Sequence, residues 1–589
     1  MLPSPRMRGT ASSLVAELQR RRVFRALVGY GLGAFAILQI VEPIMHGLHW
    51  SEMVLSYVVV ALAVGFPIVV GLAWIFDVNA GRIEKSAPVP LTQGGPGALL
   101  TAVLIGIGLL AAAPGLGWYF LWRGRDHSAP QAARAPSIAV LPFVNLSSDK
   151  EQEYFSDGLT EEILDALAQV EGLHVAGRTS SFSFKGKRDD LRMIGQKLEV
   201  AHLLEGSVRR EGNRVRVTAQ LINAADGYHL WSKTFDREMT GVFAVEDEIS
   251  RAVVEALKVR LMPGQKPRQR TVSPEVYNEY LLGKQFAQRP TLDDDRRAVA
   301  AYEKAIQLDP LFAPAWASLA RSKFGLELSG ETPPAGINEA YERGMAAAEK
   351  AVALDPELAD GYAARGFFRA YKAEWEGART DVERALALNP GDARIHLNYA
   401  WNILLPLGRL PDAIREAQRA TDLDPLSDLA WSSLGLLYLS SGQLGPAQKA
   451  SERSLRILPE QNNASVTLAG ILLTQKKPSE ALAMAEQIGF EPLRLMIKAC
   501  GLNDLGRIEE SRQMVEQMIT RYARSGTLHI AEAYACLGDR DRAFEWLERT
   551  YAMRGSSLAG IMRVNPVFRS LHGDPRFAAL LKKMNLPME

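Results

Sequence analysis

The chain has 589 residues, which is too long for a single hydrophobic core, so we expect several domains. Lysine and arginine number 68 against 67 for aspartate and glutamate, and the net charge of +1 offers no basic field for nucleic acid. Two cysteines, Cys500 and Cys536, are too few for a disulfide framework. A bridge between them is conceivable; the alternative is two ordinary small buried residues.

The N-terminal part alternates between basic and apolar segments. Residues 1–24 are polar and basic, and we expect them to be cytoplasmic. Three apolar runs predict transmembrane helices at about 25–44, 53–76 and 98–122, because a bilayer crossing needs roughly 20 apolar residues. Basic residues before the first run outnumber those of the first loop. This bias predicts an inward N-terminus, with everything after residue 122 on the far side of the membrane.

Gly29 and Gly33 form a Gly-x-x-x-Gly pattern in the first apolar run. Small residues at this spacing let two membrane helices approach closely. The pair is therefore a candidate packing face, either for a homo-oligomer or for the hairpin of the first two runs.

A compact α/β domain is expected after the apolar runs. Residues 123–136 read as a linker and 137–262 as the domain itself. It begins with a short apolar strand at 137–143, followed by a segment with helical periodicity. Apolar and polar residues then alternate through 214–221, as in a half-buried antiparallel strand. A second linker spans 263–273.

Four blocks of this domain resemble the TolB amino-terminal-like domain, and they occur in order with short gaps. They are Ile138–Phe143, Tyr154–Thr160, Leu204–Val208, and Leu230–Ser232 with Phe235-Asp236. The resemblance implies a small domain outside the cytoplasmic membrane of bacteria that works in envelope assemblies and carries no chemistry. Related chains often begin with a nucleotide cyclase or a winged-helix module, and the 22 or so residues before the first apolar run are too few for either.

A closing proline recurs through the C-terminal half. It stands at Pro310, Pro356, Pro390, Pro425, Pro459 and Pro492, which gives intervals of 46, 34, 35, 34 and 33 residues. The first interval carries an insertion near 326–337. The others lie close to the period of roughly 34 residues that is typical of tetratricopeptide (TPR) repeats.

The unit at 429–459 resembles the TPR family most closely. Its signature residues are Trp431, Leu434, Gly435, Tyr438, Ala447 and Pro459. The first helix presents its large residues on one face, the glycine lets a second helix approach, and the proline ends the unit. One unit cannot bury its own apolar face, so about eight repeats are expected to stack over 274–552, with a cap at 553–589. The predicted fold class is thus multi-domain: three transmembrane helices, a small α/β domain and an all-α TPR superhelix.

No pattern indicates a catalytic residue, a cofactor or a metal site: a nucleophile elbow, a His-Glu-x-x-His pattern and a phosphate loop are absent from the sequence. His202, His229 and His396 are interpreted as structural residues. Two acidic groups, Glu161-Glu162 and Asp293–Asp295, are either general acids or a cation site, or carboxylates that favour a helix start. A basic group consists of Arg178, Lys185, Lys187 and Arg188. It is interpreted either as a contact for anionic lipid or glycan or as a solvated loop.

This architecture favours a non-enzymatic scaffold of the bacterial envelope, integral to the inner membrane, which binds protein or peptide partners and no nucleic acid. The candidate groove residues on the first helices are Asn398, Asn402, Ser432, Ser433, Asn463 and Thr467. The alternative is a sensory or regulatory subunit that works with a separate cytoplasmic output protein, such as a nucleotide cyclase or a transcription factor.

Overall fold

The computed structural model describes two parts of the chain. Residues 136–586 are described apart from 188, 240–241, 258–271, 290, 330–333 and 555–557, and residues 30, 32–34, 36–37, 62, 76–79 and 82–85 are described before them. The chain divides into two compact units, Met1–Ala133 and Arg134–Glu589.

The described residues of the first unit overturn the prediction of three transmembrane helices. Among them, no helix combines the length and the apolar character that a bilayer crossing demands. Phe76, the expected end of the second span, instead begins β1 (Phe76–Asn79), which pairs antiparallel with β2 (Arg82–Lys85). An apolar run is a necessary condition for a spanning helix but not a sufficient one. The rest of 25–44, 53–76 and 98–122 lies mostly outside the described residues.

Three dependent predictions are corrected with it. The multi-pass inner-membrane localisation with a periplasmic C-terminal part rested on those helices, as did the integral-membrane and transmembrane-oligomer assignments. Gly33 lies in a helical piece and has no atom within 4 Å of where its Cβ would stand. Gly29 lies outside the described residues.

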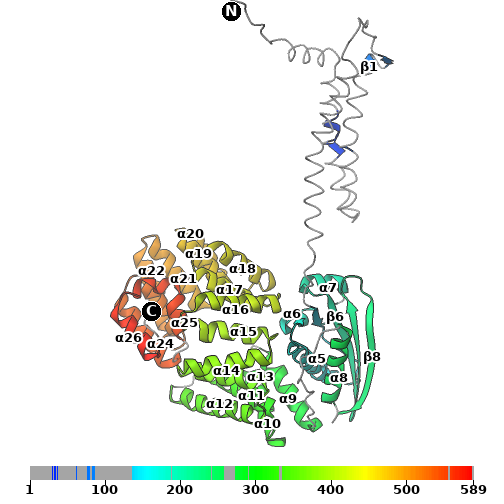
Figure 1. Cartoon of the computed structure of the whole chain (residues 1–589). Coiled ribbons are helices and arrows are strands. Elements are labelled where there is room, and N and C mark those ends of the chain that lie inside the picture. The colour runs from blue at the N-terminus through cyan, green and yellow to red at the C-terminus, as the bar shows by residue number, and fades with distance from the viewer. Residues whose placement is uncertain are drawn as a thin grey trace, which may run out of the picture. The chain divides into compact units, whose positions relative to one another are not determined.

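The second unit begins with a sheet in the order β5-β3-β6-β7-β8, with β4 pairing with β6 (Figure 1). The strands are β3 (Ser137–Val140), β4 (Val144–Asn145), β5 (His174–Val175), β6 (His202–Glu211), β7 (Arg214–Asn223) and β8 (His229–Glu238). β3 is parallel to β5 and β6, whereas β6, β7 and β8 form an antiparallel meander. The alternation seen in 214–221 matches β7, whose residues are buried at every second position.

Helices cover both faces of the parallel strands. The short helical elements η1 (Lys150–Gln152) and α6 (Arg178–Phe182) accompany α5 (Glu153–Ala168), α7 (Leu191–Leu198) and α8 (Val242–Ala256). Leu159, Ile163 and Leu167 fall at i, i+4 and i+8 of α5 and are fully buried in one core with Ile138. Ala139, the next residue of β3, belongs to a separate core that α7 closes. β3 is therefore buried on both faces.

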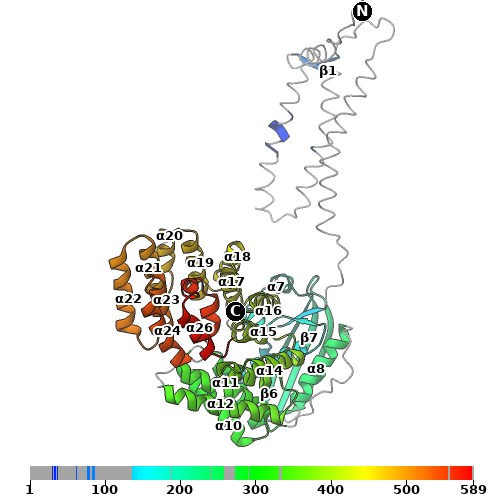
Figure 2. The same ribbon diagram turned by 60° about the vertical axis from the view of Figure 1, so that its left-hand side comes forward.

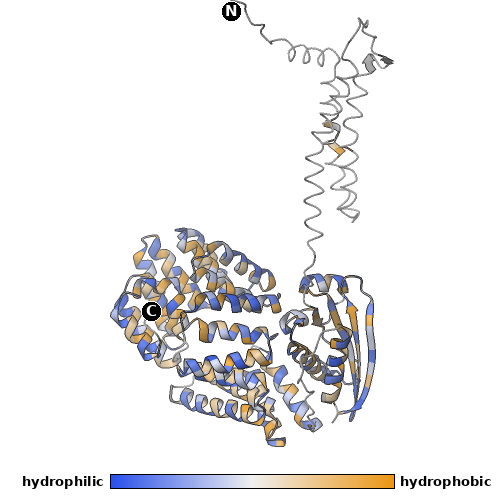
Figure 3. Ribbon diagram, viewed as in Figure 1, coloured by the Kyte–Doolittle hydropathy of each residue, from blue (hydrophilic) through white to orange (hydrophobic). Residues whose placement is uncertain are grey.

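The rest of the unit is a TPR-like superhelix. Within the described residues it has eight helical hairpins, each a first and a second helix, followed by a C-terminal segment (Figures 1 and 2). The hairpins are α9 (Pro274–Ala287) with α10 (Leu292–Leu308), α11 (Ala313–Ser329) with α12 (Pro334–Leu354), α13 (Ala359–Tyr371) with α14 (Trp375–Leu388), α15 (Ala393–Tyr399) and η3 (Ala400–Leu404) with α16 (Leu410–Leu423), α17 (Asp428–Ser440) with α18 (Leu444–Ile457), α19 (Asn462–Thr474) with α20 (Pro478–Ala485), α21 (Glu491–Asp504) with α22 (Ile508–Tyr522), and α23 (Thr527–Cys536) with α24 (Arg540–Arg554). The helices carry hydrophobic residues beside hydrophilic ones, as elements with one buried side do (Figure 3).

The signature residues explain the close packing of a hairpin. A Cβ on Gly435 would lie 2.5 Å from Ser451 Oγ of the second helix, so only glycine allows this approach. Ala447 is fully buried between the helices. The indole of Trp431 donates to the carbonyl of Pro425 at 2.9 Å, and Trp316 donates to Pro310 at the same distance. The recurring proline turn thus also anchors the next first helix.

The C-terminal segment returns to earlier repeats. It consists of α25 (Leu558–Val564), η5 (Pro566–Leu571) and α26 (Pro575–Lys583). The indole of Trp375 donates to the carbonyl of Met584 at 2.9 Å, and Arg569 Nη2 donates to the carbonyl of Ser440 at 3.1 Å. These contacts span more than 120 residues of sequence, as the pairs 375–584 and 440–569 show, and they close the superhelix on itself (Figure 2).

Candidate ligand pocket in the superhelix

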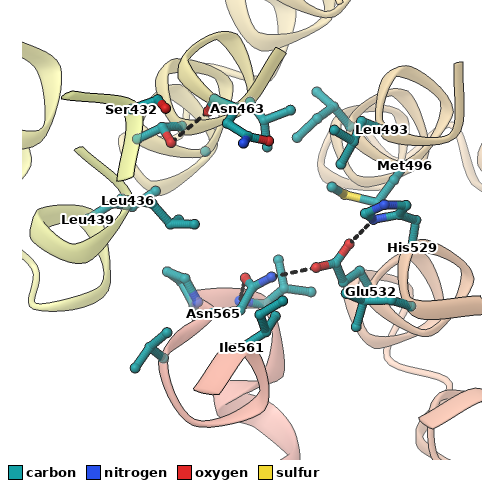
Figure 4. Close-up of a pocket in the computed structure, with 18 of the residues that line it drawn as sticks. Ser432, Leu436, Leu439, Asn463, Leu493, Met496, His529, Glu532, Ile561 and Asn565 are labelled. Carbon is teal, nitrogen blue, oxygen red and sulfur yellow. Dashed lines mark hydrogen bonds and ion pairs between the residues drawn. The ribbon is translucent and has the colours of Figure 1, made fainter. Parts of the chain in front are cut away.

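A pocket of about 660 Å³ lies inside the superhelix. Its lining comes from the first helices of five successive hairpins, α15 with η3, α17, α19, α21 and α23, and from the C-terminal segment at α25 and η5. Figure 4 shows Ser432 and Asn463 on one side of the space, with Ile561 and Asn565 opposite. The volume is in the range of sites that enclose small ligands, roughly 300–1,000 Å³.

All six candidate groove residues lie in the pocket lining. Two of them offer little to a ligand: Ser432 Oγ donates to the carbonyl of Leu429 at 3.0 Å, and Thr467 Oγ1 donates to that of Asn463 at 2.9 Å. Both side chains are buried. Across the described residues, the side-chain amides of Asn398, Asn402 and Asn463 have no hydrogen-bond partner, so these amides remain available to a ligand.

The local structure of η3 positions two further lining residues. η3 is a π-helical turn that continues α15 without a break and carries Trp401 and Asn402. Such turns are rare and occur often at functional sites. In the part of the chain that the structure describes, Trp401 Nε1 is buried without a hydrogen-bond acceptor. No pattern in the sequence signals this turn.

The lining is mainly apolar. The larger apolar side chains that the groove prediction omitted include Leu436, Leu439, Met496, Ile497 and Ile561. The four on α17 and α21 follow the same first-helix periodicity as the predicted residues, so the sequence pattern could have predicted them as well. Ile561 belongs to the C-terminal segment, whose return to the pocket depends on long-range packing that no local pattern encodes.

A polar chain, also missed from the sequence, crosses the wall between α23 and the C-terminal segment. His529 and Glu532 are three residues apart on α23 and therefore share a face. His529 Nδ1 lies 2.8 Å from Glu532 Oε2, and Asn565 Nδ2 donates to Glu532 Oε1 at 2.7 Å (Figure 4). Asn565 also caps η5 by accepting from the backbone N–H of Val567. The side chain of Glu532 is only 5% exposed, so this chain of hydrogen bonds holds the pocket wall together.

A disulfide joins Cys500 and Cys536, whose Cα atoms are 5.3 Å apart. It resolves the two sequence alternatives in favour of the bridge. Both residues also line the pocket, so the disulfide ties α21 to α23 at the pocket wall. Asn503 Nδ2 reinforces this link by donating to the carbonyl of Cys536 at 3.0 Å.

The three histidines and the acidic run that the sequence analysis singled out fall outside the pocket. His396 bridges Glu416 and the carbonyl of Pro390, His202 lies 3.1 Å from the carbonyl of Ser137, and His229 is exposed on β8. The acidic run Asp293–Asp295 occupies the first turn of α10. Within the described residues, no three histidine, cysteine or acidic side chains are arranged to hold a metal ion.

The expectation that Glu161 and Glu162 mark a helix start is wrong, because α5 begins at Glu153 and both lie in its interior. They form ion pairs with basic side chains of the same chain: Arg178 Nε lies 2.7 Å from Glu161, and Lys284 Nζ lies 2.7 Å from Glu162. Burial opposes ionisation of Glu161, yet Lys284 and Arg178 hold its pKa below the usual value. The Lys284 pair ties the α/β domain to α9, whereas the Arg178 pair links α6 to α5 within the domain.

The other basic candidates also have partners. Lys185 Nζ lies 2.5 Å from Asp157 and 3.0 Å from Glu153, and the ammonium of Lys187 lies 5.9 Å from the centre of the Phe184 ring. Arg188 lies outside the described residues. The basic group is therefore largely occupied by contacts within the domain.

Comparisons with known proteins find matches to parts of this chain. Residues 133–252, which contain most of the α/β domain, match the family model "HilA/YgeH-like transcriptional regulator, second domain". The resemblance of the same region to a TolB amino-terminal-like domain stays a prediction.

A Rhizobium meliloti (strain 1021) protein described as "Putative adenylate cyclase 3" is 42% identical over 210 residues, which is 35% of this chain and 36% of that protein. The match thus spans about a third of the relative's length. Among solved structures, the superhelix is similar to pilF of Pseudomonas aeruginosa (21% identity, TM-score 0.30, 38% of this chain and 98% of that chain). It is also similar to the TPR protein TTC0263 of Thermus thermophilus (24% identity, TM-score 0.28, 34% and 99%).

Proposed function

We propose that this chain is a non-enzymatic interaction module that holds a segment of a protein or peptide partner in the superhelix pocket. The observation that carries the proposal is the composition of the pocket wall. Five successive first helices supply mostly apolar side chains together with a few amide groups, which is the usual composition of a ligand-binding pocket. Stacked repeats also commonly use their concave face for binding.

A photo-crosslinking experiment tests this proposal. A benzophenone amino acid replaces Leu436, which lines the pocket, in the full chain. The matched control carries it at Leu505, which is 39% exposed and does not line the pocket. We expect covalent adducts with a discrete partner at position 436 and not at 505. Equal labelling at both positions would contradict a pocket-specific role.

A second candidate function is regulatory. The similarity to a cyclase-named relative and to the second domain of a transcriptional regulator favours a sensory or regulatory subunit that acts on a separate output protein. Deleting the pocket function by Val466→Trp, a substitution in the lining, would then change cyclic-nucleotide levels or transcript levels in cells. If binding is lost while both outputs stay unchanged, this second candidate is excluded.

A further inference from the structure

We propose that the pocket recognises the free amino terminus of a short apolar peptide, and that Glu532 forms the ion pair with its ammonium group. The inference rests on the proposed function, because it names the part of the partner that enters the pocket. It also predicts which chemical group decides affinity.

Glu532 is a buried carboxylate in the pocket lining. Its two carboxylate oxygens contact the His529 ring at 2.8 Å and the Asn565 amide at 2.7 Å, and neither partner carries a permanent positive charge. Throughout the described part of the chain, no lysine or arginine nitrogen lies within 4.0 Å of Glu532. A buried carboxylate is stable when a cation is paired with it. A ligand ammonium supplies that cation.

The charge of the whole lining favours an amino terminus over a carboxyl terminus. The charged lining residues are Glu532, Asp504 and Lys476, which give two negative charges and one positive charge, a sum of −1 with His529 neutral. Lys476 is 82% exposed and lies 3.9 Å from Asp504, so it sits away from the buried carboxylate. A carboxyl terminus placed beside Glu532 would meet a like charge in a poorly solvated site.

The shape of the pocket favours a chain end over a continuous segment. α25 and η5 form the side opposite α17 and α19, and Arg569 fixes them to α17 through Ser440. This arrangement obstructs the path that an extended segment would take along the whole concave face. A terminus needs only one entrance.

The remaining polar groups suit a peptide backbone. The amides of Asn398, Asn402 and Asn463 each offer both a donor and an acceptor, which is the pairing that a peptide unit requires. Apolar side chains of the peptide then contact the Leu436, Leu439 and Met496 side of the pocket.

The test uses three matched mixtures of four-residue peptides composed of Ala, Val, Leu and Phe. The first has a free amino terminus and a C-terminal amide, the second is the same mixture with the amino terminus acetylated, and the third is acetylated with a free carboxylate. Binding to the full chain is measured by calorimetry and native mass spectrometry. We expect the free-amine mixture to bind at least tenfold more tightly than the second mixture, and the third to bind most weakly.

Variants of the chain assign the preference to Glu532. Glu532→Gln is expected to bring the affinity for the free amine down to that of the acetylated peptides and to leave the latter unchanged. The control Glu545→Gln removes an exposed carboxylate on α24 that pairs with Arg549, and it is expected to change nothing. If Glu532→Gln does not fold, Asn565→Ala removes one hydrogen bond to the Glu532 carboxylate while keeping its charge. The comparison of the three mixtures on the unmodified chain then still decides whether the pocket prefers a free amino terminus.

The outcomes separate the two proposals. Equal affinity for the free-amine and acetylated mixtures, abolished by Val466→Trp in the pocket lining, overturns the amino-terminus inference and leaves the peptide-binding function standing. Absence of binding by all three mixtures, together with unchanged crosslinking at position 436 in Val466→Trp, contradicts both.

Discussion

The first hairpin and the later hairpins of the superhelix bury the apolar faces of their first helices in different ways. In the first hairpin, Tyr277, Tyr280 and Leu281 of α9 pack into the same core as Phe155 and Leu159 of the α/β domain. In the hairpins from α15 to α23, first-helix side chains instead line the pocket. Each first helix thus presents an apolar face: the α/β domain covers it at α9, and the C-terminal segment faces it across the pocket in the later hairpins.

The largest expected effect comes from disrupting the core that α9 shares with the α/β domain. Tyr277 is fully buried, and its hydroxyl donates to Glu246 Oε1 at 2.5 Å. Tyr277→Ala leaves a cavity and removes this donor from a buried carboxyl group, so we expect a loss of about 3–5 kcal/mol in the free energy of unfolding. Urea denaturation measures it. Tyr228→Ala, at a 74% exposed position, is the control, and a similar loss there would refute the explanation.

The stability of the hairpins that line the pocket depends on a covalent link between α21 and α23. The disulfide between Cys500 and Cys536 closes a sequence separation of 36 residues. The double variant Cys500→Ala with Cys536→Ala is expected to lose about 2–4 kcal/mol, because the unfolded chain regains freedom. Thermal unfolding with and without reductant checks this. Reductant should lower the stability of the unmodified chain and leave the double variant unaffected; any other pattern counts against the link.

A smaller effect is expected at the contact between the α/β domain and the middle repeats. Asp424 Oδ1 accepts from the backbone N–H of Ser180 at 2.8 Å and from its hydroxyl. Asp424→Ala leaves this buried donor unpaired, at a cost of about 1–3 kcal/mol. Asp424→Asn keeps an acceptor and should retain most of the stability. Calorimetric unfolding distinguishes them, and identical losses for both variants would mean that the hydrogen bonds do not matter.

A further effect concerns the pH dependence of stability at Asp392, the N-cap of α15. Burial, followed by the nearby Asp360 carboxylate, raises the pKa of Asp392 to about 7. The folded state then binds this proton more tightly than the unfolded chain, so stability is greatest below about pH 4 and falls as pH rises toward 7. Asp392 also pairs with Arg394 at 2.9 Å, and this ion pair favours the ionised form, so it opposes the fall in stability with rising pH.

Asp392→Asn preserves the helix cap at α15 while removing the charge. Its stability is expected to decline less between pH 4 and 7 than that of the unmodified chain, as measured by thermal melts across that range. Parallel pH profiles would show that Asp392 does not carry the dependence.

The sequence predicted the features that recur in every repeat and missed the pocket residues that occur in one repeat or in the C-terminal segment alone. The proline spacing and the Gly435 signature indicated stacked hairpins. The first-helix periodicity selected Asn398 and Asn463 as candidate groove residues; both line the pocket, and their role in binding stays a prediction. Glu532 and His529 escaped because their repeat lacks the closing proline and is read less easily. The apolar runs misled for the opposite reason: hydropathy reports a preference for an apolar environment and says nothing of which environment is adopted.

Closure of the superhelix through Trp375 and Met584 has a consequence for how such a chain changes over time. An open solenoid gains or loses one unit by duplication or deletion with little harm, since each unit touches only its neighbours. Here an added hairpin would carry the two contact partners apart and unseat the C-terminal segment. The contact between Trp375 and Met584 therefore couples the number of units to the position of the C-terminal segment.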